Sequence, residues 1–440
     1  LIVAQQGDVV LAGGDKVTLQ AGANGHLQIA VDPATVNSLI ENQQLIKADG
    51  GQVIMTTAAA SSVWSNVVSN TGTIEAKEMA GQAGKVVLSA DSQHGEVQIG
   101  GLIDVSGQTA AGQVVAEAHI VTHNGEIRAN STEAIAGQVK LLGTSIQLQA
   151  NSQIQADGAT GGGTVQIGAS KDNLENELQA NLITLAETAS IRANAIQQGN
   201  GGRITLIADL NNHHSETQIK GSLSAWGGGL GGNGGFIETS AAILGVGGRA
   251  RINTSSSRGR QGTWLLDPED FTVAASGGNI TGTALSTALG SNDVTIQTSS
   301  TTASCSGASC TTGTSGNGDI VVNDSISWSS NHTLTLSAYR NVTVSAPISL
   351  SGSTGAALNI YANAASAASY TTAGSGSGGI AINAPVTVSG LAATVTLNAS
   401  AITDISSTGL TFGAGGSITY PDVSSSTTGR LTINVKAYTL

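Results

Sequence analysis

Three carboxylates that could take part in acid–base chemistry lie close together near the middle of the chain. Asp267, Glu269 and Asp270 follow Trp264 in the segment Gly262-Thr-Trp-Leu-Leu-Asp-Pro-Glu-Asp-Phe. Neighbouring carboxylates can serve as general acid and general base. Charged residues are sparse in this chain, however, and they do not recur on one predicted strand. We therefore assign no catalytic residue and expect no enzyme.

The same segment fits a structural corner better than a catalytic site. An apolar run that ends in Asp-Pro is typical of a chain that leaves the core and turns. We predict a structural junction in which the apolar residues anchor in the core and the Asp-Pro pair makes the turn. The residues of this junction are Trp264, Leu265, Leu266, Asp267 and Pro268.

Residues that could bind a metal ion or form a covalent link are few. His213 and His214 are adjacent, and adjacent strand residues face opposite sides, so we predict solvated loop histidines. Cys305 and Cys310 stand in the segment Ser-Cys-Ser-Gly-Ala-Ser-Cys. Their spacing is too wide for a CxxC redox motif, and no second pair completes a zinc site. We predict a small disulfide-closed loop, and the alternative is two reduced surface thiols.

Glycine-rich segments give no sign of a nucleotide site. Residues 199–202 and 227–235 are rich in glycine, but neither Lys-Ser nor Lys-Thr follows them, and no strand–helix context supports phosphate binding. Gly316-Asn-Gly-Asp is similar to a single calcium-binding nonapeptide, without tandem copies. We expect no cofactor and no metal ion.

The composition predicts many short strands joined by turns. Glycine accounts for 59 of 440 residues, and charged residues for only 10%, whereas average proteins have about 7% glycine and about 25% charged residues. Hydrophobic content is still 40%, which is too high for a disordered chain. The net charge is −12 without a basic stripe, so nucleic acid is not an expected partner.

A glycine followed by an alternating strand recurs along the first half of the chain. In a strand, alternate residues face the same side, so Val86 and Leu88 should face one way and Lys85, Val87 and Ser89 the other. One such unit has no closed core, but stacked units bury a continuous apolar column. We expect glycine at the corners because it tolerates positive φ. The anchoring glycines are Gly51, Gly84, Gly112, Gly137, Gly163, Gly202 and Gly235.

The second half repeats as well, with more serine and threonine. The segment that starts at Gly318 resembles the one at Gly378, and Thr333-Leu-Thr-Leu-Ser-Ala resembles Thr394-Val-Thr-Leu-Asn-Ala. We predict β-helix coils over 1–262, a junction and loop-rich segment over 263–318, and Ser/Thr-rich β-helix repeats over 319–440. Two short helices are expected outside the coils, at 33–42 and 58–70, the first with a proline at its first position.

The midpoint carries a family resemblance. Gly231-Gly-Asn-Gly-Gly-Phe-Ile-Glu-Thr-Ser, followed by the segment from Gly262 to Val273, resembles the filamentous-haemagglutinin-like large exoproteins of bacterial two-partner secretion. The segment from Ile40 to Val53 is similar to the region just after their secretion domain. The similarity covers most of 1–345. The Asn-Pro-Asn motifs of the secretion domain are absent from this sequence, so we expect a segment of a longer protein.

The resemblance and the repeats together predict a right-handed parallel β-helix with short extra-helical loops. The family implies export through an outer-membrane transporter and adhesion to a host or bacterial surface receptor or matrix. We expect a secreted or cell-surface structural adhesin of a Gram-negative bacterium, which could self-associate into fibres through open coil ends. The alternatives are a polysaccharide-processing β-helix enzyme and a passive stalk for a distal toxin or haem-ligand domain.

Overall fold

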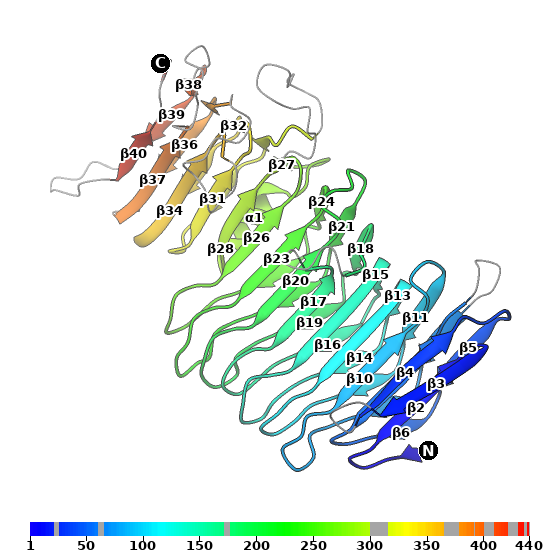
Figure 1. Ribbon diagram of the computed structural model, residues 1–440. Helices are drawn as coiled ribbons and strands as arrows, with labels where there is room; N and C mark the ends of the chain where they lie inside the picture. The colour runs from blue at the N-terminus through cyan, green and yellow to red at the C-terminus, as the bar shows by residue number, and fades with distance from the viewer. Residues whose placement is uncertain are drawn as a thin grey trace. The chain divides into compact units, whose positions relative to one another are not determined.

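The protein is almost entirely β. The computed structural model describes residues 1–21, 26–59, 66–170, 177–299, 316–364, 378–390, 392–399, 409–420, 430–434 and 438–439. Over these residues it contains one α-helix, and most strands pair in long parallel sheets (Figure 1). The all-β, parallel part of the prediction is therefore confirmed. Within the described residues, no helix is long and apolar enough to cross a membrane.

The chain divides into two compact units. Unit 1 comprises Leu1–Asp209, Ile219–Ile237 and Thr254–Gly262, and unit 2 comprises Leu210–Gln218, Glu238–Asn253 and Thr263–Leu440. In each unit, successive stretches of chain lay strands above one another in parallel columns, and we call each such stretch a rung.

Unit 1 has three columns of parallel strands. The first contains β2 (Asp8–Gly13), β7 (Gln52–Thr57), β10 (Lys85–Ser89), β13 (Gln113–His123), β15 (Gln138–Leu148), β17 (Thr164–Gly168) and β20 (Arg203–Ile207). The second contains β5 (Ser38–Asn42), β8 (Asn66–Asn70), β11 (Gly95–Ile99), the second halves of β13 and β15, and β18 (Leu182–Leu185). The third contains β1 (Ile2–Val3), β6 (Leu45–Lys47), β9 (Thr73–Glu75), β12 (Leu102–Asp104), β14 (Glu126–Arg128), β16 (Gln153–Gln155), β19 (Ser190–Arg192) and β22 (Ser222–Ser224).

The core of unit 1 consists of aliphatic side chains in register. Val86 and Leu88 are fully buried, whereas Lys85, Val87 and Ser89 reach solvent, so the predicted alternation is confirmed. In the third column, the middle residue of each strand is buried and stacks on its equivalent in the next rung. This isoleucine column consists of Ile46, Ile74, Ile103, Ile127, Ile154 and Ile191.

The anchoring glycines of unit 1 are required by close packing rather than by positive φ. A Cβ on Gly137 would lie 2.1 Å from the carbonyl oxygen of Gly112, and one on Gly112 would lie 2.1 Å from that of Gly84. None of these three glycines has a positive φ. The same carbonyls accept the ladder hydrogen bonds, such as Gln138 N to Gly112 O at 3.0 Å. Our expectation of positive φ at these corners was therefore wrong.

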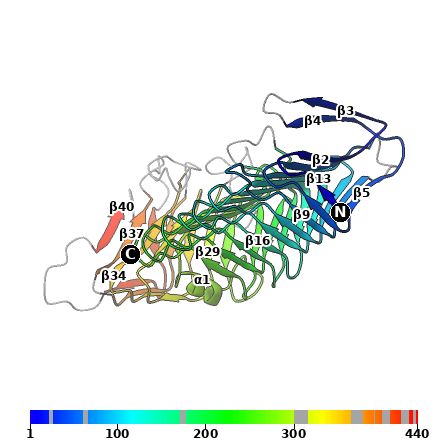
Figure 2. The ribbon, with the colours of Figure 1, turned by 90° about the horizontal axis from the view of Figure 1, so that it is seen from below.

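A β-hairpin extends from the first rung of unit 1. Its strands β3 (Lys16–Ala21) and β4 (Leu27–Asp32) pair antiparallel in a separate two-stranded sheet. Figure 2 shows the hairpin standing apart from β2.

Neither helix predicted from the sequence is found in the described residues, and residues 60–65 of the second lie outside them. Residues 38–42 form β5, and residues 66–70 form β8, which pairs with it in parallel. Within β5, burial alternates, so that Leu39 is 62% exposed and Asn42 is buried. Pairing with neighbouring rungs overrides a weak helix preference here.

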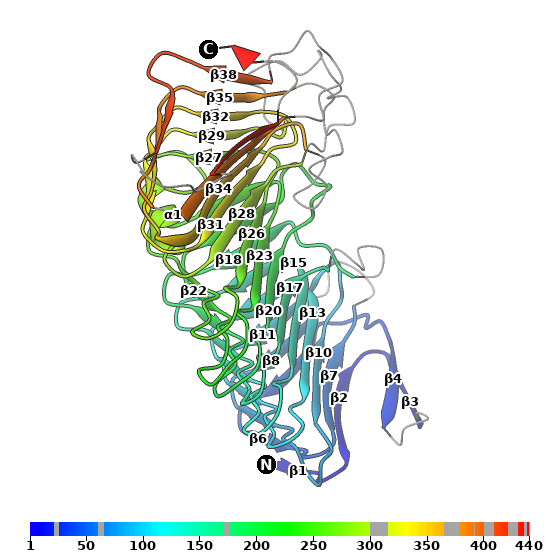
Figure 3. The same ribbon diagram turned by 90° about the vertical axis from the view of Figure 1, so that its left-hand side faces the viewer.

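Unit 2 also has three columns of parallel strands, and Figure 3 labels strands of the first two. The first contains β26 (Thr263–Asp267), β28 (Asp293–Gln297), β31 (Thr333–Ser337), β34 (Thr354–Tyr361), β37 (Ala392–Asn398) and β40 (Leu431–Asn434). The second contains β27 (Phe271–Val273), β29 (Ile320–Val322), β32 (Val342–Val344), β35 (Ile380–Ile382), β38 (Leu410–Phe412) and β41 (Tyr438–Thr439). The third contains β30 (Ile326–Trp328), β33 (Ile348–Leu350), β36 (Pro385–Val388) and β39 (Ser417–Thr419). The remaining strands are β21 (Glu216–Ile219), β23 (Phe236–Ser240), β24 (Ile243–Val246) and β25 (Arg251–Asn253).

The helix α1 (Gly282–Ala288) packs beside β30. Its N-cap hydroxyl on Thr281 accepts a hydrogen bond from Ala284 N, and Leu285 and Ala288 are buried. The Oγ of Ser286 accepts a hydrogen bond from Ser327 N at 2.9 Å. The sequence carried a signal for α1 that we missed, namely a threonine cap followed by apolar residues at helical spacing.

Candidate functional site

The acidic cluster of unit 2 is built around the corner after β26. Asp270 accepts hydrogen bonds from the backbone N–H groups of Gly316, Gly318 and Asp319 at 2.7, 2.8 and 2.9 Å. Burial raises the pKa of Asp270, against the opposing effect of these hydrogen bonds. The carboxylate therefore holds the start of the next rung in place. The Gly316-Asn-Gly-Asp segment, which is similar in sequence to a calcium-binding nonapeptide, supplies hydrogen-bond donors to Asp270.

The neighbouring Glu269 meets a histidine from a distant part of the sequence. The Nδ1 of His213 lies 2.7 Å from Oε1 of Glu269, although 56 residues separate them. The Glu269 side chain is 11% exposed and that of His213 is 48% exposed. The pair borders an open pocket of about 480 Å³, also lined by His214 and Asp270. A carboxylate and an imidazole in contact can exchange a proton, so acid–base chemistry is geometrically possible at this pair.

Four of the five junction residues are buried, and Leu265 is partly exposed. Trp264 and Leu266 are fully buried, and the indole Nε1 of Trp264 donates a hydrogen bond to Thr239 Oγ1 at 3.0 Å. Leu265, on the opposite face of β26, is only partly buried. Asp267 ends the strand, and Pro268 follows it outside any strand. The interior thus receives two of the three apolar residues expected there, because alternation within β26 turns Leu265 outward.

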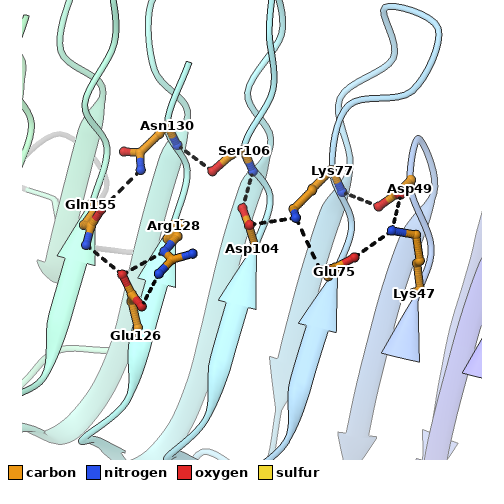
Figure 4. Close-up of polar contacts among 10 residues, drawn as sticks. All are labelled: Lys47, Asp49, Glu75, Lys77, Asp104, Ser106, Glu126, Arg128, Asn130 and Gln155. Atoms are coloured by element: carbon orange, nitrogen blue, oxygen red, sulfur yellow. Dashed lines mark hydrogen bonds and ion pairs between the residues drawn. The ribbon is translucent and has the colours of Figure 1, made fainter. Parts of the chain in front are cut away.

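A ladder of polar side chains crosses the outer face of the third column of unit 1 (Figure 4). Lys47 Nζ lies 2.7 Å from Glu75 Oε2, and Lys77 Nζ lies 3.3 Å from Glu75 Oε1 and 3.1 Å from Asp104 Oδ2. The hydrogen bond from Lys47 lowers the pKa of Glu75, and that same bond raises the pKa of Lys47. The Lys47–Glu75 and Lys77–Asp104 pairs therefore link adjacent rungs, whereas the Lys77–Glu75 pair lies within one rung. We call this set the polar ladder; its residues are Lys47, Asp49, Glu75, Lys77, Asp104, Ser106, Glu126, Arg128, Asn130 and Gln155.

The polar ladder continues through Glu126 in the same unit. Arg128 donates two hydrogen bonds to Glu126, from Nε at 2.7 Å and from Nη2 at 2.6 Å. Gln155 Nε2, one rung further on, donates to Glu126 Oε1 at 2.7 Å. The hydrogen bond to Glu126 also raises the pKa of Arg128. The outer face thus carries acidic and basic side chains on successive rungs, at the strand spacing of about 4.8 Å.

Short polar side chains next to this column bind the backbone of the following rung. Asp157 N donates to Asn130 Oδ1 at 2.8 Å, Asn194 N donates to Asp157 Oδ1 at 2.9 Å, and Trp226 N donates to Asn194 Oδ1 at 3.1 Å. The sequence carried a signal for this stacking that we missed, namely the recurrence of Asn or Asp one residue after an alanine.

In the described part of the chain, the other residues singled out from the sequence do not come together in a metal, redox or phosphate site. Cys305 and Cys310 lie outside the described residues. No group of three or more metal-ligating side chains occurs in the described part of the chain. In the segment 227–235, Gly232 packs against backbone rather than forming an open phosphate loop, since a Cβ on it would lie 1.8 Å from Gly199 O.

No protein-family model matches the chain, and no curated protein matches it significantly.

Proposed function

We propose that the chain forms a right-handed parallel β-helix. The supporting observation is that the parallel columns within each unit are connected rung by rung, and connections between parallel strands of one sheet are nearly always right-handed. The buried isoleucine column of unit 1 provides the continuous apolar core that a solenoid needs.

We further propose that this β-helix is a structural adhesin segment, a rigid rod or fibre element that presents a binding surface. The observation that carries this function is the register of the outer face. In unit 1, side chains of the polar ladder are held at fixed positions on successive rungs by hydrogen bonds and ion pairs. Such a face can contact a receptor or matrix at many points without reorganising, which lowers the entropic cost of binding.

Adhesion can be tested with the purified chain on beads. We expect saturable retention on a host matrix or bacterial surface, competed by the free chain and lost when the beads carry heat-unfolded chain. Glu75→Gln and Glu126→Gln would alter retention if the polar ladder makes contact, whereas Gln98→Ala, on an outward position of β11, serves as the control. Retention equal to that of uncoated beads on every surface would refute adhesion.

Secretion through an outer-membrane transporter is part of the proposal and rests on the sequence resemblance. Co-expression of the gene with a gene for an outer-membrane transporter of two-partner secretion should release the protein from the cell. Equal release without the transporter gene would contradict this route.

A second candidate is polysaccharide processing, which the Glu269–His213 contact alone favours. Glycan depolymerisation that disappears with Glu269→Gln would support this candidate. Absence of cleavage over a broad panel of acidic and neutral polysaccharides would leave the adhesin as the better proposal.

A further inference from the structure

An open groove lies between the hairpin β3–β4 and the outer face of the first column of unit 1. It encloses about 810 Å³. One wall is formed by the consecutive residues 26–29 of the hairpin, and the floor includes Ile54 of β7 and Val87 of β10. Figures 2 and 3 both show the hairpin held away from β2 on this side.

The floor of the groove belongs to an apolar stripe on an outward-facing surface. Val10, Ile54, Val87 and Val115 are equivalent positions on four successive rungs. All four are partly exposed, although outward positions of a strand normally carry polar side chains. The stripe is therefore apolar surface that the rest of unit 1 leaves partly open to solvent.

The hairpin presents a second apolar face. Val17 pairs with Val31, and Leu19 pairs with Ile29, so these four side chains share one side. Val17 is 39% exposed and Leu19 is 54% exposed. A two-stranded hairpin is marginally stable alone, and further apolar contact would stabilise it.

The edge of β4 that faces the groove has backbone groups that could pair with another strand. Leu27 N donates to Asp8 Oδ2 at 2.6 Å, and Leu27 O accepts from Gln52 Nε2 at 3.0 Å, so the backbone of Leu27 points away from β3. Ile29, two residues further on, points the same way because strand geometry repeats every two residues. Within the described residues, neither a strand nor a side chain pairs with Ile29 on that edge. An unpaired edge is a template for another strand.

The charges that line the groove are basic. Among the described residues that line it, Lys85 is a cation, His26 is an imidazole and none is a carboxylate, although the chain as a whole carries −12. Asp8 lies beneath, where it contacts His26 Nδ1 at 2.9 Å. Lys85 is exposed and can reach an anionic group in the groove.

The geometry points to a docking site for an extended polypeptide strand of a partner protein. The strand has apolar side chains at alternate positions and an acidic residue among the outward ones. Its backbone pairs with the Ile29 edge of β4, its apolar side chains cover Ile54 and Val87, and its carboxylate meets Lys85. The inference rests on unit 1 alone and goes beyond the proposed adhesive role.

The test is selection of short random peptides on the immobilised chain, followed by affinity measurement by fluorescence anisotropy. We expect enrichment of peptides that alternate apolar and polar residues and carry one acid. Val87→Ser should weaken their binding about tenfold, because one apolar contact is lost. Val115→Ser is the matched control, since Val115 is in register with Val87 but does not line the groove.

Two further measurements separate this strand from other occupants. Bound peptide should slow amide exchange at Ile29, and N-methylation of the peptide backbone should abolish binding. Lys85→Gln should weaken the acidic peptide but leave its Gln-substituted analogue unchanged. The proposal is overturned if selection enriches no alternating peptides, or if Val87→Ser binds them as tightly as the unaltered chain. It is also overturned if the groove is occupied by a second copy of the chain, seen as a dimer that Val87→Ser dissociates, or by a fatty acid that the peptides cannot displace.

Discussion

His123 is an ionisable side chain at a position that neighbouring rungs fill with aliphatic residues. It is fully buried at the end of β13, in register with Ile99 on one side and Leu148 on the other. Its Nδ1 and Nε2 each lie 3.2 Å from a backbone carbonyl oxygen, of Ile99 and of Gln153. Burial lowers the pKa of His123, and this outweighs the opposing effect of the two carbonyls.

We predict that acid destabilises unit 1 in part through His123. Because its pKa is lowered in the folded chain, the unfolded chain binds more protons below the ordinary histidine pKa of about 6.5. The contribution of His123 to stability is thus present above that pH and is lost as the pH falls. In urea unfolding at neutral and mildly acidic pH, His123→Leu should show a smaller loss of unfolding free energy than the unaltered chain. An unchanged pH dependence in His123→Leu would contradict the prediction.

For single residues, the alternation of buried and exposed side chains within a strand could be predicted from the sequence, but contacts between residues far apart in the sequence could not. The burial of Val86 and Leu88 follows from strand periodicity alone. The contact between His213 and Glu269 does not, because it depends on how many residues each intervening rung contains. The position of His123 could be read as inward, but a polar residue there contradicts the pattern that defines the strand.

The recurring elements of unit 1 depend on glycine for a reason that the sequence does not reveal. The repeat identified the correct glycines. A sequence alone, however, does not distinguish a glycine needed for positive φ from one needed because the backbone of the next rung packs against it. We predict that Gly137→Ala costs about 1–3 kcal/mol of unfolding free energy, since its Cβ would lie 2.1 Å from Gly112 O and the backbone must shift.

The control for Gly137→Ala is Gly229→Ala, also in unit 1. Gly229 is exposed, has no positive φ, and has no atom within 4 Å of an added Cβ. Chemical denaturation should show little change, or a slight gain from the less flexible unfolded chain. Equal losses in the two variants would show that close backbone approach is not the reason for glycine at residue 137.

The strands themselves were predictable as a class, but their boundaries with loops and helices were not. Residues 38–42 and 66–70 have weak preferences of their own, and their parallel pairing across rungs decides the outcome. The helix α1 was hidden in a stretch whose serine and threonine content suggested loop, although Leu285 and Ala288 are spaced for one buried face.

The polar ladder should stabilise unit 1 over a range of pH, which ends where Glu75 becomes protonated in acid and where Lys47 loses its proton in alkali. The lowered pKa of Glu75 gives stability that is present above its ordinary pKa and is lost as the pH falls through the folded value. The raised pKa of Lys47 gives stability that is present below about pH 10.4 and is lost at higher pH. Glu75→Gln should therefore flatten the acid limb of the stability curve, by about 0.2–1 kcal/mol for a partly exposed pair. High salt should reduce the difference, and a salt-independent difference would point to packing instead.

Whole-molecule behaviour should follow from contacts that each rung makes only with its neighbours in the stack. In such stacks, stability is close to a sum of rung terms and nearest-neighbour interface terms. Ile127 contacts the rungs of Ile103 and Ile154 through the isoleucine column, so Ile127→Ala should cost about 2–5 kcal/mol. Hydrogen exchange should accelerate most in β12, β14 and β16 and least in β22, several rungs away. Acceleration of equal size in all four strands would show instead that unit 1 unfolds as a single cooperative block. The description of its stability as a sum over rungs would then be wrong, even though the columns are regular.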